Sequence, residues 1–146
     1  MDPDPLRDKL RGCLSRARNT FSNHPSATHL NILCYDASYL MINGELLFEA
    51  LYGEETCHLA LKNPHQVDSS MNWNGLYYQD NRWELISALI WPRIRCMEGG
   101  NGFFVKCHVF PNPRQIRQVT AAFEGLPNFQ VVRYDDDARR NAKHSC

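Results

Sequence analysis

A glycine-rich turn and an apolar strand with one embedded lysine follow each other in Met97-Glu98-Gly99-Gly100-Asn101-Gly102-Phe103-Phe104-Val105-Lys106-Cys107-His108-Val109-Phe110. The glycines favour a tight turn, and the Phe- and Val-rich run from 103 to 110 favours a buried strand. Lys106 interrupts that run, and an ammonium group buried without a partner is strongly destabilising unless it loses its proton. The stretch therefore predicts either an edge strand whose lysine reaches water or a strand that carries a functional lysine.

The charges of the chain are balanced, with 16 Lys and Arg against 16 Asp and Glu in 146 residues. A net charge of zero excludes binding through a bulk basic field, so contact with nucleic acid requires a local patch. Basic residues gather in the N-terminal segment and again near the C-terminus. We therefore expect an RNA-binding patch that combines Arg16, Arg18, Arg139, Arg140 and Lys143 with Lys106.

Six cysteines are present, and the dipeptide Cys-His occurs twice, at Cys57-His58 and Cys107-His108. Neighbours on a strand face opposite ways, so each dipeptide offers one ligand per face, whereas a structural zinc site needs four ligands. The chain starts with acidic and polar residues, and no apolar run approaches the length of a membrane span. We expect reduced thiols without a metal in an intracellular protein, cytoplasmic or nuclear, that does not cross a membrane.

Helical and strand patterns alternate along the chain, which predicts an α/β sandwich around a mainly parallel sheet. Segment 38–51 is ambiguous, because Asn43-Gly44 is typical of a hairpin turn while the leucines after it fit the helical period; we favour a helix that stops at Gly53. The predicted helices span 5–21, 83–97 (kinked by Pro92) and 113–123, the predicted strands span 29–35, 56–61, 103–110 and 129–134, and 62–81 is predicted to be irregular.

The length suits one domain over residues 1–146, with an N-terminal helix and loop at 1–28 and a charged tail at 135–146.

A resemblance to the FtsJ-type RNA 2′-O-methyltransferases rests on three segments: the helix turn Leu14-Ser15-Arg16-Ala17, the strand Asn31-Ile32-Leu33-Cys34-Tyr35-Asp36, and the block from Trp83 to Phe110. The resemblance implies a single Rossmann-like domain, S-adenosylmethionine as the cofactor and a Lys-Asp-Lys-Glu catalytic tetrad. It assigns Lys106 as the central lysine, which takes the proton of a ribose 2′-hydroxyl, and Asp68 as the catalytic aspartate. Cofactor binding falls to Asp36, Ser38 and Gly44.

The chain departs from that family at three places. No lysine stands near Thr20, where the first lysine of the tetrad falls, and the final glutamate has no counterpart. Bulky residues in 37–44 replace the glycines that let a nucleotide approach the backbone. We therefore expect S-adenosylmethionine binding to be weak or absent.

These observations predict a degenerate methyltransferase-like domain that binds RNA or a partner protein, and the small size would suit a viral protein. Two alternatives stay open. One is an active S-adenosylmethionine-dependent RNA methyltransferase that a partner chain completes, and the other is an unrelated protein-interaction module that uses 62–81. In that segment the aromatic side chains of Trp73, Tyr77 and Tyr78 either stack bases or cover the core.

Overall fold

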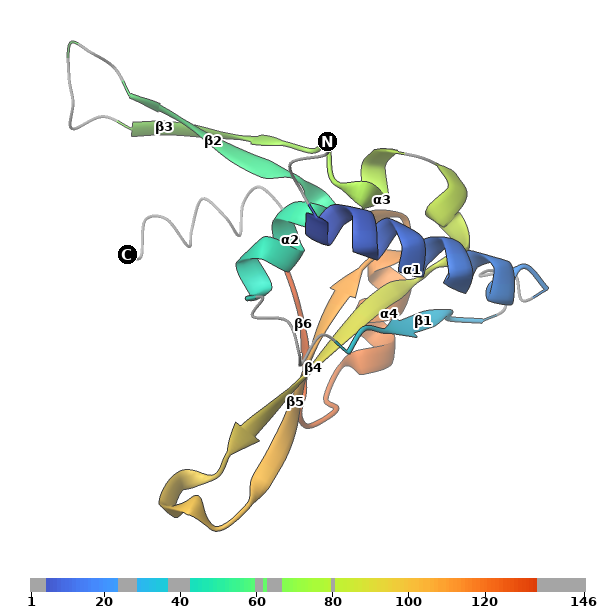
Figure 1. Ribbon diagram of the computed structural model, residues 1–146, viewed down its shortest axis with the longest axis vertical. Helices are drawn as coiled ribbons and strands as arrows, with labels where there is room; N and C mark the ends of the chain where they lie inside the picture. The colour runs from blue at the N-terminus through green and yellow to red at the C-terminus, as the bar shows by residue number, and fades with distance from the viewer. Residues whose placement is uncertain are drawn as a thin grey trace.

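The structure, a computed structural model, describes residues 5–23, 29–36, 43–59, 62, 67–79 and 81–133 (Figure 1). In chain order the elements are α1 (Pro5–Phe21), β1 (Ile32–Cys34), α2 (Gly44–Tyr52), β2 (Glu54–Leu59), β3 (Val67–Asn72), α3 (Leu76–Gln79), the 3-10 turn η1 (Asn81–Leu85), β4 (Ala88–Cys96), the 3-10 turn η2 (Glu98–Gly100), β5 (Phe103–Pro111), the 3-10 turn η3 (Pro113–Gln115), α4 (Ile116–Phe123) and β6 (Phe129–Val131).

Four strands form the main sheet in the order β1-β4-β5-β6. Strand β1 runs parallel to β4, β4 antiparallel to β5, and β5 parallel to β6. Strands β2 and β3 form a separate antiparallel hairpin. The protein is therefore mixed α/β, and two of the three pairings in its main sheet are parallel, in agreement with the predicted fold class at this level.

The predicted helix over 83–97 is wrong, because this segment forms the turn η1 and then strand β4. All nine residues of β4 pair with β5. Pro92 is tolerated in this strand because its nitrogen faces the β1 side, beyond the point where β1 ends. The even-numbered residues of β4 direct their backbone groups towards β1, as when the Ile90 carbonyl accepts a hydrogen bond from the Tyr35 N–H (2.8 Å). The pairing with β1 ends at Ile90, so the missing N–H of Pro92 interrupts no ladder.

The predicted strand over 56–61 exists as β2, but it lies outside the main sheet. Its partner is β3, which forms within the segment 62–81 that was predicted to be irregular. The polar sequence of β3 gave no alternating apolar pattern, because Ser69 and Ser70 are exposed and Met71 is the residue of this run that packs against the core.

Helix α2 begins at Asn43, whose side-chain oxygen accepts a hydrogen bond from the Leu46 N–H (2.9 Å). It ends at Gly53, where φ is 134° and where a Cβ would overlap the carbonyl oxygen of Asn72. The helical interpretation is therefore confirmed for 44–52, and Asn43-Gly44 caps a helix rather than turning a hairpin.

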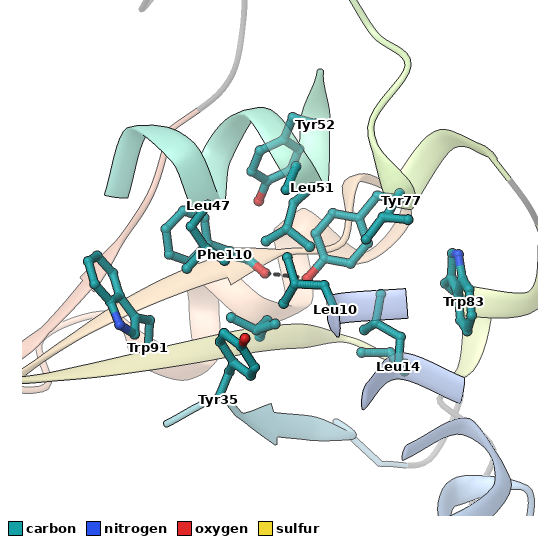
Figure 2. Close-up of a cluster of buried hydrophobic side chains, with 14 of the residues drawn as sticks. Leu10, Leu14, Tyr35, Leu47, Leu51, Tyr52, Tyr77, Trp83, Trp91 and Phe110 are labelled. Carbon is teal, nitrogen blue, oxygen red and sulfur yellow. Dashed lines mark hydrogen bonds between the residues drawn. The ribbon is translucent and has the colours of Figure 1, made fainter. Parts of the chain in front are cut away.

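Helices cover both faces of the main sheet. Helices α1, α2 and α3 pack on one face, where Leu10, Leu47 and Tyr77 lie against Phe110 (Figure 2). Helix α4 packs on the other, where Val119 meets Ala88 and Val109. The hydroxyl groups of Tyr52 and Tyr77 donate hydrogen bonds to the carbonyls of Pro111 (2.7 Å) and Phe110 (2.8 Å), which ties the helices to the end of β5.

The aromatic residues between β3 and α3 mostly cover the core. Tyr77 is buried, and Trp73 packs against the same cluster. The ring of Tyr78 lies 5.7 Å from that of Trp73 and stays 39% exposed. The covering role predicted as one alternative is therefore confirmed for Trp73 and Tyr77.

A buried polar network fixes the inner end of β4 and β5. The Asn112 amide donates to the carbonyls of Trp83 (3.0 Å) and Ile86 (2.9 Å), while its own N–H bonds to the carbonyl of Ser87 (2.8 Å). The Ser87 hydroxyl donates to the side chain of Gln115 (2.8 Å). These buried groups satisfy one another, so the network holds the fold together and leaves no free group for a ligand.

Strands β4 and β5 extend past their neighbours. The pairing with β1 involves only 88–90 of β4, and the pairing with β6 involves only 107–109 of β5. The remainder, residues 93–106, forms a two-stranded arm that projects from the body (Figure 1). We call this segment the ribbon. Separately, no helix in the described ranges combines the length and the apolar character that crossing a bilayer requires.

Candidate nucleic-acid interface

One face of the ribbon is basic. The cross-strand pairs Trp91–His108, Arg93–Lys106 and Arg95–Phe104 follow each other along β4 and β5. Residues at alternate positions of paired strands share a face, so all six side chains lie on the same side of the sheet. This side continues the face that α1, α2 and α3 cover further in, since Leu89 and Trp91 belong to their core. We call the side chains of Arg93, Arg95, Lys106 and His108 the basic face.

Contacts at the base of the ribbon hold this face in place. The guanidinium of Arg93 lies over the ring of Trp91 at 4.7 Å, and the ring of His108 lies 5.7 Å from the same indole. On the body side, Gly44 at the start of α2 packs close to Trp91. Trp91 is therefore buried between the body and the side chains of Arg93 and His108, and it contacts both.

The basic face concentrates positive charge, and within the described residues no carboxylate forms an ion pair with it. Burial lowers the pKa of His108, and the neighbouring charges of Lys106, Arg93 and Arg95 lower it further. The Nε2 atom of His108 is buried without a hydrogen-bond partner. The two ion pairs resolved in the described part of the chain lie elsewhere, on α1 and between η1 and η3, and neither includes a residue of the ribbon. Such a face attracts an anion or a chain of anions.

The basic face also carries an exposed aromatic ring. Phe104 lies opposite Arg95 and is 42% exposed. An exposed ring between cations provides a flat apolar surface on which a nucleobase stacks while its phosphates meet the neighbouring charges.

The two catalytic residues implied by the family resemblance lie in different sheets. Lys106 is on β5, within the basic face and opposite Arg93, whereas Asp68 is on β3 in the separate hairpin. Figure 1 shows that hairpin and the ribbon projecting from opposite ends of the body. The fold therefore does not bring Asp68 to Lys106.

Of the three implied cofactor residues, Asp36 and Gly44 are described and Ser38 lies outside the described residues. Asp36 is exposed directly after β1. An added Cβ at Gly44 would make only an ordinary contact, 3.4 Å, with the ring of Trp91. The neighbours of Gly44 in the structure therefore do not require a glycine there, and its implied role in cofactor binding stays a prediction.

A pocket of about 310 Å³ lies beside the start of α2, and three carboxylates line it. Carboxylates repel phosphate groups, so this pocket is not part of an RNA-binding surface. Its lining consists of Gly44, Glu45, Phe48, Glu49, Glu55 and Arg133.

The predicted RNA-binding patch is only partly described. Arg16 and Arg18 are exposed on α1, and Arg16 donates a hydrogen bond to the sulfur of Cys13 (3.3 Å). Figure 1 shows the C-terminal end of α1 and the tip of the ribbon at different ends of the molecule. The remaining predicted residues, Arg139, Arg140 and Lys143, lie outside the described residues.

Three residues of the basic face were missed from the sequence: Arg93, Arg95 and His108. In the helix predicted over 83–97, Arg93 and Arg95 would lie on different faces, and nothing would place them beside Lys106. The alternation Trp91-x-Arg93-x-Arg95, set against Phe104-x-Lys106-x-His108, is the signal that predicts a two-faced ribbon.

The described cysteines are free thiols at positions 13, 34, 57, 96 and 107. Within the described ranges, no three His, Cys, Asp or Glu side chains gather as metal ligands would.

No protein-family model, no curated protein and no solved structure matches this chain. The functional argument therefore rests on the geometry of the chain itself.

Proposed function

We propose that this protein binds single-stranded RNA inside the cell through the basic face of the ribbon. The observation that carries the proposal is the alignment of Arg93, Arg95 and Lys106, with His108 beside them, on one side of a projecting two-stranded arm; neither ion pair within the described residues involves them. A bulk electrostatic field does not contribute, because the net charge of the chain is zero.

The spacing of these charges suits a polyanion better than a single anion. Successive residues on one face of a strand lie about 7 Å apart, close to the spacing of phosphates along an extended single strand. Arg93 and Arg95 follow each other in this way on β4, and Lys106 stands across from Arg93. Phe104 adds a stacking surface that accepts any base, which favours a flexible strand with unpaired bases over a duplex.

In this proposal Lys106 contacts phosphate and does not act as a general base. The separation of Lys106 from Asp68 supports this role, because a methyl-transfer tetrad needs both groups at one substrate hydroxyl. The chain is then a Rossmann-like relative of the FtsJ-type enzymes that has kept RNA binding and lost catalysis. Titration calorimetry with S-adenosylmethionine tests the loss of catalysis: micromolar binding that Asp36→Ala abolishes would restore the enzyme alternative.

The RNA-binding proposal is tested by fluorescence anisotropy with a short labelled single-stranded RNA at several salt concentrations. Each phosphate contact on a single strand contributes a slope of about −0.7 in a plot of log affinity against log salt, so three or four contacts give a slope of about −2 to −3. The double variant Arg95→Gln/Lys106→Gln should reduce that slope by about 1.4 and weaken binding at low salt at least tenfold.

The matched control is Arg16→Gln/Arg18→Gln, which removes the same number of positive charges from the exposed surface of α1. If the control weakens binding as much as the ribbon variant, the site is not the ribbon. If the wild-type protein shows no salt-dependent binding at low ionic strength, the RNA proposal is wrong and a protein-interaction module takes its place.

A further inference from the structure

The face of the ribbon opposite the basic face is apolar and exposed. Ile94 and Val105 are cross-strand partners on it, and Phe103 pairs with Cys96 one step nearer the tip. Phe129 on β6 is in register with Cys107 and extends the same side. The exposed fractions are 69% for Ile94, 73% for Phe103, 46% for Val105 and 37% for Phe129. We call these four side chains the apolar face.

The body covers only the inner end of this side of the sheet. There, Val119 of α4 packs on Ala88 and Val109, and the ring of Phe123 lies 5.3 Å from that of Phe129. The apolar face therefore begins where this second core stops, with Phe129 at the boundary between them. A two-stranded ribbon with one bare apolar side is marginal by itself, and a contiguous exposed apolar patch of this kind marks an interaction surface.

We propose that a second copy of this chain covers the apolar face, so that two ribbons pack against each other about a twofold axis. The charges of the ribbon favour this occupant. The alternate residues on the apolar side carry no charge, whereas the opposite side carries the cations Arg93, Arg95 and Lys106, which repel their own copies. A twofold interface pairs a surface with itself, so it requires a neutral, self-complementary face, and the ribbon offers one.

The small area of the apolar face limits the stability of this dimer. Four side chains with these exposures offer on the order of 400 Å² per copy, about half of what each partner contributes to a standard interface. The dimer is therefore weak and reversible. The two basic faces then point outward on opposite sides of the paired ribbons. If the proposed RNA binding holds as well, one dimer presents two RNA-binding surfaces.

Sedimentation velocity tests the proposal over protein concentrations from low micromolar to several hundred micromolar. The wild-type protein should shift from monomer to dimer with rising concentration. The variant Ile94→Thr/Phe103→Thr should raise the dissociation constant at least tenfold for each side chain changed, because it removes most of the apolar area. A wild-type protein that stays monomeric at the highest concentration overturns the proposal and leaves a different partner for this face.

A matched control separates the ribbon from general surface hydrophobicity. Leu46 on α2 is 45% exposed and lies outside the apolar face, so Leu46→Thr should leave the dimer unchanged. Circular dichroism confirms that each variant is folded. A dimer that survives Ile94→Thr/Phe103→Thr in a folded protein places the interface elsewhere and also overturns the proposal.

The two proposals fail independently. Arg95→Gln/Lys106→Gln should weaken RNA binding at least tenfold and leave the dimer intact, because those side chains lie on the side of the ribbon opposite the apolar face. Ile94→Thr/Phe103→Thr should abolish the dimer and leave the salt slope of RNA binding to the monomer unchanged.

Discussion

The inner and outer halves of strands β4 and β5 share one antiparallel pairing but differ in how far their two faces are buried. In the inner half, helices cover both faces, and Leu89, Val109 and Phe110 are at most 2% exposed. In the outer half none of the described elements covers either face, and Ile94 and Phe103 are about 70% exposed. The same backbone ladder therefore serves two purposes: the inner half supplies the core, and the outer half presents side chains to a ligand or to another chain.

The largest expected effect separates the two halves with one substitution. Phe110→Ala should lower the free energy of unfolding by about 3–5 kcal/mol, because it leaves a cavity beneath α1 and α2. Phe103→Ala makes the same change on the same strand at a position 73% exposed, and it should shift stability by less than about 0.5 kcal/mol. Chemical denaturation of both variants at a dilution where the protein is monomeric checks the comparison. Equal losses would mean that the ribbon is as tightly packed as the body.

A second pair compares glycines of the two regions. Gly53→Ala should destabilise the protein by about 3 kcal/mol or more, because φ is 134° there and the new Cβ would overlap the Asn72 backbone. Gly100→Ala in the turn of the ribbon meets no neighbouring atom and strains only its φ of 73°, so about 1 kcal/mol is expected. Thermal unfolding measures both losses, and a larger loss at Gly100 would contradict the comparison.

The buried polar network gives an intermediate effect confined to the inner half. Asn112→Ala removes the hydrogen-bond partner of the carbonyls of Trp83 and Ile86. We expect a loss of about 2–3 kcal/mol, since buried carbonyls are then left unsatisfied. RNA affinity should not change, because the ribbon is not touched. A folded Asn112→Ala protein with weakened RNA binding would show that the network positions the basic face.

The smallest effect is a pH dependence at the junction between the halves. Because the pKa of His108 is lowered in the folded protein, the unfolded chain takes up a proton at this side chain first as the pH falls. The contribution of His108 to stability is therefore complete above its unfolded pKa of about 6.5 and decreases as the pH falls towards the lowered folded value. Lys106, Arg93 and Arg95 face this imidazole and disfavour its charged form.

Urea unfolding of the wild type and His108→Asn between about pH 7.5 and 5 measures this contribution. The wild type should lose more stability over that range than the variant does. Parallel curves would show that His108 titrates alike in both states, and that its cationic neighbours do not act on it.

Local sequence patterns predicted correctly the elements whose apolar spacing matches the secondary structure that the fold gives them. The leucine spacing predicted α1, and it predicted α2 against the competing hairpin signal of Asn43-Gly44. The apolar run after Gly102 predicted β5, and Lys106 was recognised as a side chain that needs a partner or water. Segment 83–97 was mistaken for a helix because Ile86, Ile90 and Ile94 recur every four residues, which is a multiple of the strand period as well.

The sequence by itself determined the mixed α/β class, the glycine turn at 99–102 and the chemical importance of one lysine within an apolar strand. Tertiary structure alone decided which residues stand beside that lysine. Arg93 and Arg95 are more than ten positions from Lys106 along the chain, and only the antiparallel pairing of β4 with β5 sets them on one face. It also separated Asp68 from Lys106, because the choice of strand partners depends on the whole core and is not encoded in any short segment.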